Sequence, residues 1–461
     1  MPQPAKADKF TRMTTMPIPG LICSLAAPTI VSMLVTSFYN MADTFFVGRI
    51  GTSASAAVGV VFSLMAVIQA CGFFFGHGSG NFISRALGAH DDDQAARMAA
   101  TGFFSALIAG ALLAVVGLIF IRPLARLLGS TPTILPYAVD YMRFILIGTP
   151  FMMSSLVLNN QLRFQGNAVY AMVGIISGAF LNIALDPLLI FGFGMGIAGA
   201  ALATIISQFV SFCLLLYGTR RSDNLNIRLR CFTPSWFYYR NIIRGGMPSL
   251  CRQGLNSLGT ICLNLGAGPY GDAAIAAMSI VSRIVMFANS CVIGFGQGFQ
   301  PVCGFNYGAK KYGRVKEAFW FCVKFATLFL CGAAVLAFAF APSLVAVFRR
   351  GDAEVLAVGR VALRAQCLTF PLSAWIVLCN MMMQTIGKSV HASFLAMARQ
   401  GLFFIPAVLI LPRLFGLFGL EISQAVADVI TFIVAIPLQI SVFREMDAEV
   451  PPATYAKEKA A

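Results

Sequence analysis

One carboxylate stands where the chain is otherwise apolar enough to lie in a lipid bilayer. It is Asp186, in the stretch FLNIALDPLLIFG that runs from Phe180 to Gly192. At bilayer depth a carboxylate costs at least about 2.5–3.5 kcal/mol on insertion scales, and burial disfavours its charged form, so it needs a partner or a function. Asn182 lies four residues earlier, which places both side chains on one face of a helix. Pro187 is expected to kink that helix beside the acid.

A second acid, Asp43, lies in the stretch SFYNMADTFFVG, with Tyr39 four residues before it and Asn40 about one turn away. Two acids that face one cavity would share hydrogen-bond partners and titrate as a coupled pair, so that one could hold a proton near neutral pH. We therefore expect protonation and cation binding to compete at this pair. Two simpler interpretations stay open: a water-exposed acid at a helix end for Asp43, and a hydrogen-bonded structural acid for Asp186.

Other polar residues in apolar surroundings could extend this site. Asn159 and Thr204 could complete the cluster, or they could serve ordinary packing between helices. The second half of the chain has possible secondary residues, which are two acids spaced two turns apart and two arginines inside apolar segments: Glu421, Asp428, Arg252 and Arg283. An Arg–carboxylate pair that closes a cavity is possible among them.

Several patterns resemble enzyme or metal sites without the context that such sites need. GMGIAG at 194–199 matches a dinucleotide-binding glycine pattern, but it joins apolar helices instead of following a strand. GHGSG at 76–80 lacks the lysine of a phosphate loop, so its glycines are expected to allow close helix packing. His77 and His90 are not spaced as metal ligands, and the twelve cysteines contain no C-x-x-C pair. We expect no enzyme activity, no metal and no cofactor.

The elements that must position these residues are membrane-spanning helices. Of the 461 residues, 58% are hydrophobic and 11% are charged, which is far too apolar for a soluble domain. Apolar runs long enough for a helix to cross the hydrocarbon layer recur about twelve times. They are expected near 18–44, 56–80, 96–121, 136–160, 166–192, 196–219, 238–266, 274–302, 316–343, 356–384, 390–414 and 417–443. The fold class is therefore an all-α integral membrane protein with twelve transmembrane helices.

The distribution of charge predicts the orientation. The net charge is +15, and the positive-inside rule places both termini in the cytoplasm of a multi-pass protein of the inner (plasma) membrane. The densest basic region is the central loop, with Arg220, Arg221, Arg228 and Arg230. We interpret this loop as an anchor to anionic lipids and not as a nucleic-acid site.

An internal repeat divides the chain. A shift of 220 residues pairs Pro28 with Pro248, and it pairs GHGSGNFISRALGAH at 76–90 with GQGFQPVCGFNYGAK at 296–310. A shift of 221 residues pairs Asn159 with Asn380. An almost constant offset across different helices indicates duplication. We expect an N-terminal six-helix lobe at 1–219, a basic cytoplasmic connecting loop at 220–237, and a C-terminal six-helix lobe with a cytoplasmic tail at 238–461. Such lobes commonly rock around a midplane site, as in a transporter.

From about residue 15 to 445 the chain resembles the multidrug and toxic compound extrusion (MATE) transporters. The resemblance rests on Pro28 followed by NMADTFFVG, on GHGSGNFISRALG, and on LNIALDPLLIFG, in that order within a twofold repeat. It implies two lobes around a central cavity, through which amphipathic drugs or toxic metabolites leave in exchange for H⁺ or Na⁺, and it suggests a monomer in the lipid bilayer.

The resemblance also implies roles for particular residues. In the MATE branch with an acidic N-terminal lobe, cation coupling falls on the positions occupied here by Tyr39, Asp43, Asn159, Asn182, Asp186 and Thr204, and the helix-1 bend falls on Pro28. The second half does not repeat the acids, since Leu263 stands opposite Asp43. No glutamate lies near Asn256, which argues against a Na⁺ site in the C-terminal lobe and makes H⁺ the preferred coupling ion.

The expected function is thus a cation-coupled antiporter that exports amphipathic organic cations by alternating access. The alternative is a flippase for lipid-linked precursors from the wider superfamily, which would favour a more cationic cavity. A channel or receptor without coupling is disfavoured by the paired acids and the duplicated halves.

Overall fold

The computed structural model describes residues 4–221, 225–348 and 351–449. Helices are the only regular elements in these ranges, so the all-α expectation is confirmed. The long helices of the first half are α2 (Ile18–Gly48), α3 (Thr52–Gly88), α4 (Asp92–Ile119), α6 (Leu135–Phe164), α7 (Ala168–Pro187) with the π-helical η1 (Leu188–Gly192), and α8 (Ile197–Thr219). We refer to α2–α8 as the N-lobe.

The second half repeats this order. Its long helices are α9 (Trp236–Ala267), α10 (Asp272–Gly308), α11 (Tyr312–Ala339), α13 (Ala353–Thr385), α14 (Ser389–Met397) continued by the π-helical η4 (Ala398–Leu402) and α15 (Phe404–Phe415), and α16 (Leu417–Ala448). We refer to α9–α16 as the C-lobe. Short helices join them: α5 (Ile121–Leu127), α12 (Ala341–Phe348), η2 (Leu229–Cys231) and η3 (Gly268–Tyr270).

Each expected span coincides with one of these long helices. Within the described ranges, eleven helices are long and apolar enough to cross a membrane. The remaining long helix is α9, whose polar residues, among them Arg252, Gln253 and Asn256, keep it less apolar than the others. The expected retained helix after the basic N-terminal residues is present as α2, but a separate helix α1 (Pro4–Thr15) precedes it because Pro17 begins a new helix.

The repeat is visible in the backbone. Positive φ angles recur at the paired positions His90 (60°) and Lys310 (57°), and again at Gly166 (82°) and Gly387 (89°). Because a left-handed conformation is rare outside glycine and asparagine, its recurrence at a lysine and a histidine marks equivalent turns after α3 and α10. The two halves therefore share a fold and not only a hydropathy pattern.

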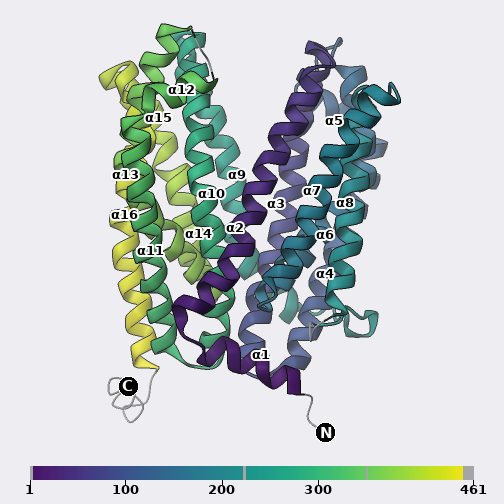
Figure 1. The fold of residues 1–461 in the computed structure, drawn as a ribbon, viewed down its shortest axis with the longest axis vertical. Coiled ribbons are helices and arrows are strands. Elements are labelled where there is room, and N and C mark those ends of the chain that lie inside the picture. Colours follow the sequence, from purple (N-terminus) through teal and green to yellow (C-terminus); the bar gives the residue numbers. More distant parts are fainter. Residues whose placement is uncertain (1–3, 222–224, 349–350, 450–461) are drawn as a thin grey trace.

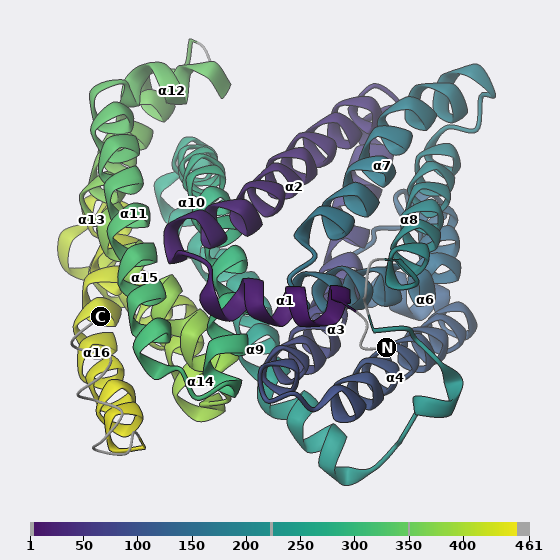
Figure 2. The same cartoon turned by 60° about the horizontal axis from the view of Figure 1, so that its bottom comes forward.

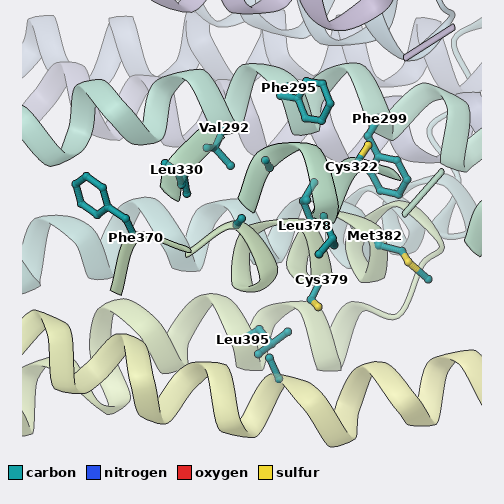
Figure 3. Close-up of a cluster of buried hydrophobic side chains, with 14 of the residues drawn as sticks. Val292, Phe295, Phe299, Cys322, Leu330, Phe370, Leu378, Cys379, Met382 and Leu395 are labelled. Atoms are coloured by element: carbon teal, nitrogen blue, oxygen red, sulfur yellow. The ribbon is translucent and has the colours of Figure 1, made fainter. Parts of the chain in front are cut away.

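The C-lobe has a continuous apolar core. Figure 3 shows Val292, Phe295 and Phe299 of α10 near side chains of α11, α13 and α14, including Cys322, Phe370, Leu378 and Leu395. The expected Met-rich stretch contributes Met382 to this core, where it is fully buried. These contacts hold the C-lobe together as one packed unit.

The two lobes converge at one end of the molecule, which we name the base, and diverge toward the other (Figure 1). The base is the end that holds α1 and the last turns of α16. Near it, α2 packs on α10 and α3 packs on α9, so each lobe lends its first two helices to the contact.

Glycines permit this close approach of the lobes, as expected for the GHGSG stretch. A Cβ added to Gly78 would meet the backbone of Ile242, and a Cβ added to Gly308 would meet the backbone of Arg85. Gly88 and Phe305 make the repeat-related contact. Backbone therefore lies directly on backbone where the lobes meet.

The helix α1 lies across the base (Figure 2) and touches both lobes. The ring of Phe10 lies 3.9 Å from the ring of His90 of the N-lobe. In the C-lobe, Asn306 Nδ2 donates to the carbonyl of Met13 at 3.0 Å, and Lys311 Nζ donates to the carbonyl of Thr14 at 3.1 Å. The first helix thus links the two lobes at their closed end.

Candidate functional site

The acid expected in the fifth apolar segment lies in the interior of the N-lobe. Asp186 is fully buried near the end of α7, and Asn182 is 1% exposed one turn before it. With the Asn182 amide oriented to satisfy its neighbours, its Nδ2 donates to Asp186 Oδ2 at 3.0 Å. Its Oδ1 then accepts from the backbone N–H of Thr204 on α8 at 3.2 Å. The expected pairing of Asn182 with Asp186 is therefore present.

The second acid lies within electrostatic reach of the first. Asp43, on α2, is partly buried, and its charge acts on Asp186. Oδ1 of Asp43 and Oδ1 of Asp186 are both buried without a hydrogen-bond partner among the described residues. Because a buried carboxylate oxygen without a partner is costly, each is ready to take a proton or a cation.

Two tyrosines border this pair. Tyr39 of α2 and Tyr141 of α6 both lie within reach of the Thr204 side chain and of the charges of both acids. Tyr39 and Thr204 were expected in the cluster, whereas Tyr141 was missed. Its fully buried position on α6 gives it no spacing relation to the acids, so nothing in the sequence pointed to it.

Asn159 occupies a different position. Its Nδ2 donates to the carbonyl of Ala171 at 3.0 Å, which bridges α6 to α7. Its repeat-related partner Asn380 donates in the same way to the carbonyl of Ala392 at 2.6 Å. Because the C-lobe has the same bond without the acids, this bond belongs to the shared fold.

Prolines lie beside both acids. Directly after Pro187, the helix changes to the π-helical turn η1, so the expected distortion lies next to Asp186. By contrast, α2 continues through Pro28 as one helix, and the neighbouring Thr29 Oγ1 donates to the carbonyl of Gly294 on α10 at 2.6 Å. The residue expected to bend thus lies where α2 crosses to the other lobe.

The expected secondary residues do not pair with one another. Asp428, 1% exposed on α16, pairs with Arg399 of η4, whose Nε lies 2.9 Å from Asp428 Oδ1, and neither expected arginine fills this role. Arg399 also donates to Ser373 Oγ at 3.0 Å. Glu421 is 6% exposed on α16, while Arg283 is exposed on α10. Arg252 lies on α9 near the base and belongs to a separate cluster described below.

The N-lobe arrangement can exchange small cations. Two carboxylates with one unsatisfied oxygen each are surrounded by hydroxyl and amide groups, which are neutral. Such a site can hold one proton shared between the acids, or a metal cation of low charge bound by oxygen atoms. No group of three or more potential metal ligands occurs in the part of the chain that the structure describes.

Comparisons with known proteins agree with this architecture. The family model MatE matches residues 28–188 and 248–409, one match in each half. The chain is 29% identical to the multidrug export protein MepA of Staphylococcus haemolyticus, over 87% of this chain and 89% of that protein. It is 27% identical to the protein of the same name from Staphylococcus saprophyticus, over 89% and 91% of the two chains.

Solved structures give the same result. A crystal structure described as MATE in the straight conformation has a TM-score of 0.90 at 26% identity and covers 95% of this chain and 99% of its own. An outward-facing multidrug resistance MATE transporter has a TM-score of 0.87 at 27% identity, with coverages of 93% and 96%. A transporter from Pyrococcus furiosus, described as having a binding pocket of reversed polarity that suggests a different function, has a TM-score of 0.88 at 26% identity, with coverages of 95% and 98%.

Proposed function

The chain belongs to the MatE family, and from that premise we propose that it is a cation-coupled antiporter that exports amphipathic organic cations. It is a multi-pass membrane transporter and not an enzyme. Its similarity to multidrug export proteins over about nine tenths of both chains supports multidrug efflux as its task. One chain supplies both lobes, so a monomer is sufficient for alternating access.

The observation that carries the coupling is the Asn182–Asp186 pair within reach of Asp43. When an ion neutralises the two carboxylates, their mutual repulsion falls, and the packing of α2 against α7 and α8 can change. Because α2 also packs on α10, a shift of α2 would be felt in the C-lobe. This connection makes α2 the element that couples ion binding to the relative position of the lobes.

We propose that the base is the cytoplasmic end, so that both termini are cytoplasmic. Basic residues gather in the turns there, including Arg85, Lys310, Lys311 and Lys388, as the positive-inside rule requires. The lobes touch at this end and diverge at the other, which corresponds to an outward-facing state. Substrate would then enter when the contacts at the base open.

The coupling ion is proposed to be H⁺, with Na⁺ as the alternative. Two acids that share neutral donors can hold one proton without further ligands. Na⁺ would need several oxygen atoms at bonding distance, which Thr204, the tyrosines and both carboxylates would have to supply together. No cofactor is required for either ion.

The test is efflux of a fluorescent organic cation from proteoliposomes under an imposed pH gradient, and then under an imposed Na⁺ gradient. We expect the wild type to transport under the pH gradient, and we expect Asp43→Asn and Asp186→Asn to insert normally but lose gradient-driven export. Asp140→Asn, on the exposed face of α6, is the matched control, and Glu421→Gln should have a smaller effect. Full coupling in both N-lobe variants would refute the mechanism.

A second candidate function is a flippase for lipid-linked precursors. It is favoured by two arginines close together at the lobe interface, Arg163 and Arg252, which would suit a phosphorylated head group. It would be supported if no organic cation moved under either gradient while a fluorescent lipid-linked diphosphate crossed the membrane.

A further inference from the structure

A second cluster of ionisable side chains lies near the base, where α3, α6 and α9 meet. Arg163 is 2% exposed and His77 is 3% exposed. Arg163 Nη2 donates to Asn160 Oδ1 at 2.6 Å and lies 3.2 Å from His77 Nε2. Since a guanidinium can only donate, His77 Nε2 must be the acceptor, and the ring proton sits on Nδ1. That proton is donated across the lobe interface to Ser249 Oγ at 2.8 Å.

Arg252 brings a second cation to the same place. It follows Ser249 by three residues, hence by about one turn on the same face of α9, and its charge acts on both Arg163 and His77. Unlike Arg163, it is partly exposed. The salt bridges of the described residues include neither arginine. Two guanidinium groups therefore approach each other across the interface without a carboxylate between them.

The cluster has unused hydrogen-bonding capacity. Arg163 Nε is buried without a hydrogen-bond partner in the described structure. Asn81, one turn after His77 on α3, is fully buried, and its amide nitrogen and oxygen both lack a partner there. A buried charged donor without an acceptor is costly, so a ligand that supplies an acceptor would be strongly favoured.

The internal repeat shows that the fold does not require these charges. At the repeat-related positions of the other half, Gln297 stands for His77 and Gln384 stands for Arg163. Gln384 Nε2 donates to the carbonyl of Gly245 at 2.7 Å and to Ser249 Oγ at 2.8 Å. A neutral amide thus satisfies the same place in the C-lobe. The position related to Arg252 is occupied by Ser32, which is also neutral.

We propose that Arg163, Arg252 and His77 form an oxyanion site between the lobes, which binds the carboxylate or phosphate of an amphipathic substrate. The substrates are then zwitterionic or anionic amphiphiles in addition to simple cations. The two arginines belong to different lobes, so an anion between them contacts both lobes at once and offsets their repulsion. This inference rests on the proposed export function and specifies the chemistry of its substrates.

The test uses two fluorescent rhodamines that differ in one group, the free carboxylic acid and its methyl ester. Binding to the purified full-length protein in detergent is measured by fluorescence anisotropy. We expect Arg252→Gln to weaken binding of the acid about tenfold and to leave binding of the ester unchanged. Arg244→Gln, an exposed arginine on the same helix, is the matched control and should change neither.

Arg163→Lys keeps a positive charge but loses the fork of donors, so it should weaken binding of the acid less than Arg163→Gln. Because Arg163 is buried, the partly exposed Arg252 decides the question if Arg163→Gln fails to fold. Equal loss of acid and ester in Arg252→Gln, or no loss of either, would overturn the oxyanion site.

A competition arm separates the two sources of an oxyanion. Displacement of the acid by a short-chain phosphatidic acid would assign the site to lipid phosphates, while retention of the acid would assign it to carboxylated substrates. The proposed function is tested separately with the ester: gradient-driven export of the ester that is lost in Asp186→Asn would uphold the antiporter even if the acid does not bind.

Discussion

Asn159 and Asn380 form the same hydrogen bond in the two halves of the chain. Each donates its Nδ2 to a carbonyl twelve residues later, Ala171 at 3.0 Å and Ala392 at 2.6 Å. Each therefore ties the fourth long helix of its lobe to the fifth. Only the N-lobe has acids nearby, so comparing the two asparagines separates a structural role from an ion-coupling role.

We expect Asn159→Ala and Asn380→Ala to destabilise the protein by similar amounts, about 1–3 kcal/mol, because each leaves a buried group without its partner. Thermal unfolding in detergent measures the loss. Neither variant should abolish gradient-driven export as Asp186→Asn does. If Asn159→Ala alone eliminates coupling at unchanged stability, the asparagine binds the ion directly, as the family resemblance implied.

Asn182→Leu should impair ion exchange while Asp186 is still present. The substitution removes the donor that lies 3.0 Å from Asp186 Oδ2. A hydrogen bond to a charged group contributes about 1.5–3 kcal/mol, so the apparent affinity for the coupling ion should change roughly ten- to hundredfold. The measurement is initial export rate against the pH of the outer solution. An unchanged profile would show that Asn182 does not act on the acid.

Asp428→Asn should strongly destabilise the C-lobe. It leaves Arg399 without its carboxylate partner in a largely buried position, and breaking such a pair costs about 3–5 kcal/mol. The double variant Arg399→Gln/Asp428→Asn removes both charges and should recover much of the loss in a thermal unfolding experiment. A double variant no more stable than Asp428→Asn would mean that the pair is not the source of the effect.

Gly308→Val should disfavour the closed base. Its side chain would collide with the backbone of Arg85, so the two lobes could not approach as they do here. Gly332→Val on α11 is the control, because the space around that glycine is open. We expect export to fall several-fold in Gly308→Val and to be retained in Gly332→Val. Spin labels on the two lobes should also report a wider base in Gly308→Val.

The sequence by itself determined the helices and the relations within each helix. Apolar length is a local property, so the twelve spans could be predicted with ends a few residues short of the observed ones. The Asn182–Asp186 pair could also be predicted, because residues four apart on a helix are neighbours in any tertiary arrangement. The offset of 220 residues likewise needed only the order of the residues.

Only the tertiary structure decided which helices meet. Arg399 reaches Asp428 because η4 packs beside α16, and Tyr141 joins the acids because α6 packs on α8. Likewise His77 meets Ser249, 172 residues away, because α3 and α9 cross where glycines let their backbones touch. Such contacts depend on the packing of whole surfaces between helices, and no spacing along one chain segment encodes them.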